Sequence, residues 1–156
     1  MRMVTLLRYF WALPNTLIGV LFVPFVVATN GRMEIVDGAL ELRGRLIATI
    51  LRHGVPIPGG AAAMTFGHVI LGRDSVSLAA TRAHERVHIE QCERWGPAFI
   101  PAYLLAALWG ATVGAGPYEG NYFERQAFLR EQRWTGKSTC DNSERPLLRP
   151  PNTSTS

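Results

Sequence analysis

The 156-residue sequence predicts an α+β domain attached to a membrane by an N-terminal helix. Three observations support this fold class: an uncharged apolar stretch near the N-terminus, short strand-like segments around a tight-turn signal, and later segments with helix start and stop signals. Charged residues make up 18% of the chain, below the roughly 25% usual for soluble domains. The composition therefore favours a membrane-associated protein over a highly solvated one.

The first element is Tyr9–Ala28, a stretch of 20 residues without a charge. As a helix it would be about 30 Å long, enough to cross the apolar core of a bilayer, with kinks at Pro14 and Pro24. We expect residues 1–30 to be a retained transmembrane anchor. A cleaved signal peptide is the alternative, but the apolar run is long for one and carries Trp11 early. Basic residues on both sides leave the orientation open.

A small antiparallel sheet should follow, within a domain of residues 31–136. The segments 33–36 and 39–42 flank Asp37-Gly38, which is a strong hairpin signal. Residues 46–51 fit a strand or a helix equally well. Met64–Leu71 is expected to be one strand, ended by Gly72-Arg73-Asp74.

Three helical segments complete the domain. The first runs from about Thr81, its expected N-cap, to Trp95 before Gly96-Pro97. Pro97–Gly116 is a second uncharged stretch of 20 residues and is expected to be a hydrophobic helix. The last helix covers about Asn121–Trp134, and residues 137–156 form a polar, Pro-rich tail expected to be disordered.

The sharpest motif is an HExxH pattern, His84-Glu85-Arg86-Val87-His88, on the first of these helices. Residues four apart share one helix face, so the two imidazoles can bind the same metal ion. Glu85 lies beside them, where a carboxylate can take a proton from a water whose pKa the ion lowers. A surface helix with two solvated histidines is the simpler alternative. We favour the metal site because half of the four histidines lie in this one motif.

A catalytic zinc site normally takes three protein ligands, so two imidazoles are not enough. No histidine follows His88, and the metzincin pattern HExxHxxGxxH is absent. The candidates for a third ligand after the motif are therefore carboxylates. The carboxylates downstream of the motif are Glu90, Glu93, Glu119, Glu124, Glu131, Asp141 and Glu144.

An HExxH motif followed by a helix that bears a Glu resembles the gluzincin group of zinc metallopeptidases. More closely, HERVHIEQCERWG and NYFERQA resemble small bacterial membrane-associated proteins with HExxHxxQ and NxFExxA motifs. The resemblance covers about residues 64–130 and is strong only at these two motifs. It implies His84 and His88 as zinc ligands, Glu85 as the base, and Glu124 as the third ligand, but it carries no substrate.

Glu124 also has a structural explanation, since Asn121 three residues earlier makes a near capping box. Glu119 is the reserve candidate, either as a ligand or as a carboxylate that orients a bound imidazole. Further residues are weaker candidates: Tyr118, Tyr122 or Arg125 as hydrogen-bond donors to an oxyanion, Gln91 as a hydrogen-bonding neighbour of the site, and His68 as a histidine of the preceding strand.

The metal site constrains the topology of the chain. If Pro97–Gly116 crossed a bilayer, His88 and Glu124 would lie about 30 Å apart on opposite sides. We therefore expect this segment to be a core helix or to lie in or dip into the membrane. The charges on the motif helix argue against burying it in lipid.

Together these features predict a membrane-associated zinc-dependent metallopeptidase-like hydrolase of the bacterial cell membrane. Zinc-bound water, activated by Glu85, would attack the carbonyl of a peptide or protein substrate. Membrane lipid is an expected partner and nucleic acid is not, since the basic residues form no cluster. The alternatives are a non-catalytic membrane scaffold with a structural or degenerate metal site, and a two-span membrane protein without metal.

Overall fold

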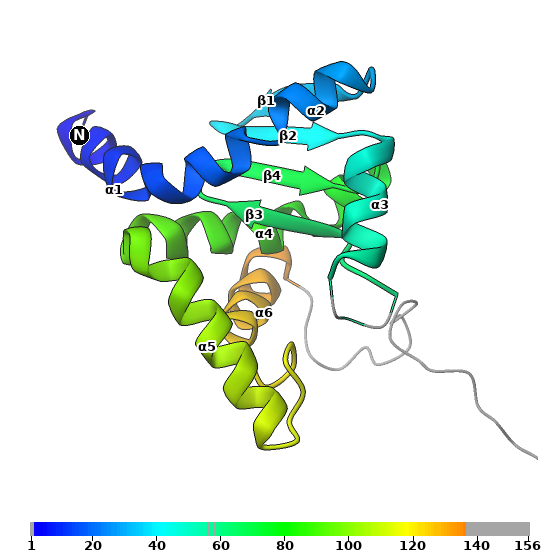
Figure 1. The fold of residues 1–156 in the computed structure, drawn as a ribbon. Coiled ribbons are helices and arrows are strands. Elements are labelled where there is room, and N and C mark those ends of the chain that lie inside the picture. Colours follow the sequence, from blue (N-terminus) through cyan, green and yellow to red (C-terminus); the bar gives the residue numbers. More distant parts are fainter. Residues whose placement is uncertain (1, 56, 58, 137–156) are drawn as a thin grey trace, which may run out of the picture.

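The protein is an α+β fold in which helices cover both faces of a four-stranded sheet (Figure 1). The structure, a computed structural model, describes residues 2–55, 57 and 59–136. The predicted fold class is confirmed, and the predicted tail, residues 137–156, lies outside the described residues. The elements are α1 (Arg2–Val20), α2 (Val23–Ala28), β1 (Arg32–Val36), β2 (Ala39–Arg43), α3 (Arg45–His53), β3 (Ala63–Phe66), β4 (Val69–Gly72), α4 (Ser75–Trp95), η1 (Gly96–Ala98), α5 (Phe99–Thr112) and α6 (Tyr122–Thr135).

The sheet has the order β1-β2-β4-β3, and it is mixed rather than wholly antiparallel as predicted. The hairpin β1–β2 forms as expected around Asp37-Gly38. β2 and β4, however, pair in parallel, with Leu40 opposite Val69 and Leu42 opposite Leu71. Parallel neighbours need a crossover connection, and the segment containing α3 and β3 supplies it. Residues 46–51, whose sequence fitted a strand or a helix equally well, belong to the helix α3.

The predicted strand Met64–Leu71 is a hairpin of two strands, so that prediction was wrong. β3 and β4 are antiparallel partners, joined by the two residues Gly67 and His68. Gly67 has φ +60°, and a glycine at the first position of a two-residue turn is typical of a tight hairpin. The short apolar run therefore folds back on itself and leaves β3 at the sheet edge.

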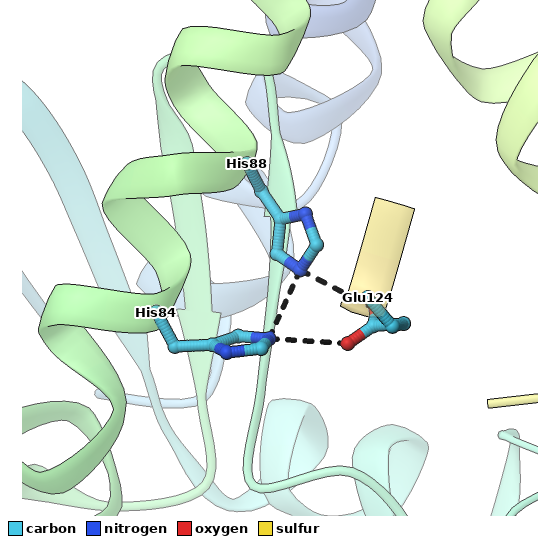
Figure 2. Close-up of side chains that lie close together, drawn as sticks. All are labelled: His84, His88 and Glu124. Atoms are coloured by element: carbon cyan, nitrogen blue, oxygen red, sulfur yellow. Dashed lines mark hydrogen bonds and ion pairs between the residues drawn. The ribbon is translucent and has the colours of Figure 1, made fainter. Parts of the chain in front are cut away.

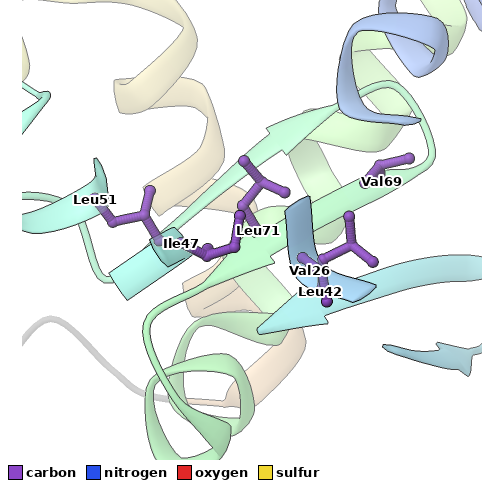
Figure 3. Close-up of a cluster of buried hydrophobic side chains, with 6 residues drawn as sticks. All are labelled: Val26, Leu42, Ile47, Leu51, Val69 and Leu71. Carbon is purple, nitrogen blue, oxygen red and sulfur yellow. The ribbon is translucent and has the colours of Figure 1, made fainter. Parts of the chain in front are cut away.

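Alternation along the two central strands gives the sheet two buried faces. Leu42, Val69 and Leu71 point to one face, where they pack against Val26 of α2 and against α3 (Figure 3). Ile70 points to the opposite face and packs with Leu78 and Ile89 of α4. On that same face the buried Glu41 accepts two hydrogen bonds from Arg82, at 2.8 and 3.0 Å. The sheet is thus fixed directly to the helix that carries the HExxH motif.

Helix α4 begins six residues earlier than predicted. Asp74 is the N-cap, because its carboxylate accepts a hydrogen bond from the amide of Ser77 at 2.7 Å. Thr81, the expected cap, lies inside the helix and donates to the carbonyl of Ser77. The predicted C-terminal end is confirmed, since α4 stops at Trp95 and Gly96 follows with φ +54°.

The N-terminal apolar segment is bent, and it is packed against the domain. It divides into α1 and α2, with Pro24 in the first turn of α2. A stripe of α1 that includes Ala12 and Asn15 is buried, and the Asn15 amide donates to the Gly96 carbonyl at 2.7 Å. Gly96 touches the ring of Trp11 so closely that a side chain there would clash. Several large apolar side chains of α1 are exposed, among them Leu6, Leu7 and Phe10.

Residues Leu6–Ala28 together are long and apolar enough to cross a membrane, with a mean hydropathy of 1.9. A membrane anchor and a signal sequence share this property. The second uncharged stretch is divided between η1, the 14-residue α5 and the loop after it, and α5 lies beside α6 (Figure 1). At about 21 Å, α5 is shorter than a bilayer core.

The central sheet provides a test of this packing. Changing Leu42, whose side chain is fully buried, to Ala should lower the free energy of unfolding by about 2–5 kcal/mol, because it leaves a cavity between sheet and helices. Leu129 is 60% exposed on α6 and is the matched control, for which Ala should change stability by less than about 0.5 kcal/mol. Thermal or denaturant unfolding of the purified variants measures both. Equal losses in the two variants would contradict the assigned core.

Candidate metal centre

Two helices carry the side chains of the candidate site. α4 presents His84 and His88 one turn apart, as the HExxH spacing predicted. Asn121 caps α6 by accepting a hydrogen bond from the amide of Phe123, and Glu124 follows in the first turn. Glu124 does not form a capping box with Asn121. The backbone N–H of Asn121, which a capping box would direct to the Glu124 side chain, donates instead to the carbonyl of Tyr118. The Glu124 carboxylate is turned towards the histidines instead.

Figure 2 shows the three side chains converging on one point. His84 Nε2 lies 3.1 Å from Glu124 Oε2, and His88 Nε2 lies 3.3 Å from Glu124 Oε1. The two Nε2 atoms are 3.1 Å apart. All three residues are buried, with between 2% and 6% of their surface exposed.

The outer nitrogen of each imidazole is held by an oxygen. His84 Nδ1 lies 3.2 Å from the Glu131 carboxylate, which can only accept, so this nitrogen carries a hydrogen. His88 Nδ1 lies 2.8 Å from Gln91 Oε1. The Gln91 amide is oriented by its two donated bonds, to the Phe123 carbonyl and to Gln126, so its oxygen must face His88. Both rings therefore donate from Nδ1 and direct Nε2 inward.

This arrangement fits a metal ion. Nδ1–H bonded to an oxygen is how metal-binding histidines are usually oriented, with the other nitrogen left to bind. A tetrahedral ion with bonds of 2.0–2.1 Å requires ligand nitrogens about 3.3 Å apart, close to the observed 3.1 Å between the Nε2 atoms. Two imidazoles and one carboxylate form a donor set that suits zinc.

The charges of the site also favour a cation. Burial alone would lower the pKa of His84, but its hydrogen bonds to Glu124 and Glu131 raise that pKa to about 10. The pKa of His88 is raised despite its burial, chiefly by its hydrogen bond to Glu124. Burial would raise the pKa of Glu124, yet the hydrogen bonds from His84 and His88 hold it well below its ordinary value. Positive charge between these groups is therefore stabilised.

Glu85 is buried next to the cluster and faces strand β3. Its Oε2 accepts a hydrogen bond of 2.7 Å from the Thr65 hydroxyl. Its charge helps to raise the pKa values of both His84 and His88, which places it within electrostatic reach of the two rings. A carboxylate held in this way can accept a proton from a water molecule beside the histidines.

The other residues considered from sequence lie in different surroundings. Gln91 is a hydrogen-bonding neighbour of the site, as suggested. Tyr118 is half-buried, and its pKa is raised by burial and by Glu124. Glu119, Tyr122 and Arg125 have exposed side chains. His68 instead stacks on Tyr9 and contacts Glu93, and Glu90 pairs with Arg130. Asp141 and Glu144 lie outside the described residues.

Sequence reasoning gave no role to three residues at this site. Glu131 lies seven residues after Glu124, two turns along the same helix face, and this spacing was a readable signal. Tyr103 donates to Glu124 Oε1 at 2.5 Å, but it lies in an apolar stretch that suggested only packing. Thr65 lies in the short strand β3, and no local sequence pattern indicated that it would contact the site. Tyr103 fixes the Glu124 carboxylate, and Glu131 fixes the His84 imidazole.

Comparison with known proteins adds no assignment. No protein-family model matches the chain, and no curated protein and no solved structure is significantly similar to it.

The histidine–carboxylate pairs should give metal-free protein a characteristic pH dependence. A histidine whose pKa is raised from 6.5 to about 10 stabilises the fold fully below pH 6.5, and this contribution is lost as the pH rises through about 10. We therefore expect the free energy of unfolding of chelator-treated protein to fall between pH 6.5 and 10. His84→Gln should remove much of that slope, whereas a change of the exposed His53 to Gln should not. Unfolding curves across this pH range provide the measurement, and identical slopes in the two variants would contradict the assignment.

Proposed function

We propose that this protein is a membrane-associated zinc-dependent hydrolase of the metallopeptidase type. The observation that carries the proposal is the convergence of two inward-facing Nε2 atoms on the buried Glu124 carboxylate, with both Nδ1 atoms already engaged. In metal-free protein the protonated histidines supply the positive charge of this cluster, and a bound metal ion would take that place. His84, His88 and Glu124 are the proposed ligands.

Zinc bound there would polarise a substrate carbonyl and lower the pKa of a water molecule towards 7. Glu85 would accept the proton of the attacking water and then pass it to the departing amine. The Thr65 hydroxyl holds the Glu85 carboxylate in place for this role. Glu131, Gln91 and Tyr103 keep the ligands oriented, a task whose loss typically costs 10–100-fold in metal affinity.

A non-catalytic protein with a structural metal is the second candidate, and the burial of the site favours it. Structural zinc sites are closed by protein ligands, whereas catalytic sites keep one position open. The three ligands here are almost completely buried. The presence of a carboxylate at Glu85, which a structural site would not need, supports the hydrolase.

The membrane location rests on the N-terminal segment, which we propose stays attached to the mature protein. Ala12, Asn15 and Val26 are fully or almost fully buried against the domain, so cleavage after Ala28 would remove part of the packed interior. The outward faces of α1 and α5 carry large exposed apolar side chains, among them Leu7, Phe10, Leu104, Leu105 and Trp109. Such surfaces favour contact with lipid.

Metal analysis of purified protein tests the ligand set. Wild type should contain about one zinc per chain, and His88→Ala and Glu124→Ala should each lose most of it because two protein ligands hold zinc poorly. His53→Ala is the matched control, since His53 is exposed at the end of α3. Elemental analysis alongside an unfolding curve for each variant separates lost ligation from lost folding. Full zinc content in folded Glu124→Ala would overturn the site.

Replacing Glu85 with Gln separates the two candidate functions. A hydrolase should keep its zinc and lose about 100-fold or more in kcat/KM, because the proton acceptor is gone. The assay is cleavage of a mixture of internally quenched fluorescent peptides by the full chain in detergent. Wild-type cleavage equal to that of Glu85→Gln, with both proteins carrying zinc, would favour the structural metal.

A further inference from the structure

A second site lies on the other side of α4. His84, His88 and Gln91 face the metal cluster, whereas Arg86, Glu90 and Glu93 project from the opposite face of the same helix into a hollow of about 630 Å³. Its walls come from α1, the β1–β2 turn, α4 and α6. A volume of this size is ordinary for a small-molecule site.

The charged side chains of this hollow leave one arginine without a partner. Arg86 pairs with Asp37 at 2.8 Å, and Arg130 pairs with Glu90 at 2.7 Å. Glu93 is shared between Arg8, at 3.7 Å, and His68, at 3.2 Å. Arg94 makes no hydrogen bond or ion pair within the part of the chain that the structure describes. Four arginines therefore face three carboxylates, so an entering anion finds a free guanidinium.

An apolar groove adjoins this hollow. It has a volume of about 470 Å³ and is lined by Leu7, Phe10 and Trp11, and it shares Arg8 and Glu93 with the first hollow. Leu7 and Phe10 are 71% and 74% exposed, and nothing in the described chain covers them. The two hollows therefore place a surplus positive charge next to an uncovered apolar channel.

We propose that the two hollows form one binding site for an anionic phospholipid. The phosphate lies among the arginines beside Arg94, and an acyl chain runs along Leu7, Phe10 and Trp11. A charged head joined to an apolar tail is the one ligand class that uses both parts. The groove belongs to the helix that we propose meets the membrane, so lipid is also the molecule available there.

Binding of short-chain lipids to the full-length protein in detergent tests this site. Dihexanoyl phosphatidylglycerol should raise the melting temperature at concentrations at least about tenfold lower than dihexanoyl phosphatidylcholine or inorganic phosphate. Arg94→Gln should weaken phosphatidylglycerol binding about tenfold and abolish the preference for it. Arg52→Gln, at an exposed arginine of α3, is the matched control and should leave the preference intact.

Phe10→Ala tests the apolar half: it should weaken binding of both lipids and leave any binding of phosphate unchanged. Arg94→Gln with wild-type preference would overturn the proposal, and so would inorganic phosphate that binds as tightly as phosphatidylglycerol, because that result indicates an anion site without a tail. Zinc content should be unchanged in every variant. Lipid-binding results that contradict the proposal, obtained with normal zinc content, therefore count against the lipid site alone, and not against the metal centre.

Discussion

The packing of α4 against α6 is the constraint on which the rest of the structure depends, and polar groups fix it. Gln91 alone joins the His88 ring to the Phe123 carbonyl and the Gln126 side chain. Glu124 and Glu131, both from the other helix, contact the two nitrogens of the His84 ring. These groups lie beside the apolar cluster of Ala12, Cys92, Phe99 and Phe123. Since buried polar groups are costly unless paired, this register between the helices is strongly favoured over its neighbours.

The sequence anticipated the features that depend on local spacing. Residues four apart on a helix share a face, so the positions of His84 and His88 relative to each other followed directly. The Asp37-Gly38 turn and the end of α4 at Gly96 also followed from neighbouring residues in the sequence. The contact between Glu124 and the histidines does not depend on local spacing, because about 35 residues and a whole helix separate the motifs. Only a resemblance pointed to it, and the ligand roles stay predictions.

The failures have physical reasons of the same kind. The sheet was expected to be antiparallel because the visible turn signal joined neighbouring strands, whereas the parallel pair β2–β4 depends on a crossover that no local pattern records. Met64–Leu71 is a short apolar run that resembles one strand in sequence, and the turn that divides it is marked only by Gly67, with φ +60°. Tyr103 and Thr65 acquire their roles only through contacts made by distant helices and strands.

The hydrogen bond between Asn15 and the Gly96 carbonyl has a consequence for biosynthesis, because 81 residues separate its ends. At the usual 5–20 residues per second, a ribosome needs roughly 4–16 s to make that intervening chain. Throughout this interval the first helix has been synthesised but lacks the surface that will cover Ala12 and Asn15. The first helix can therefore dock against Gly96 only after these 81 residues have been made.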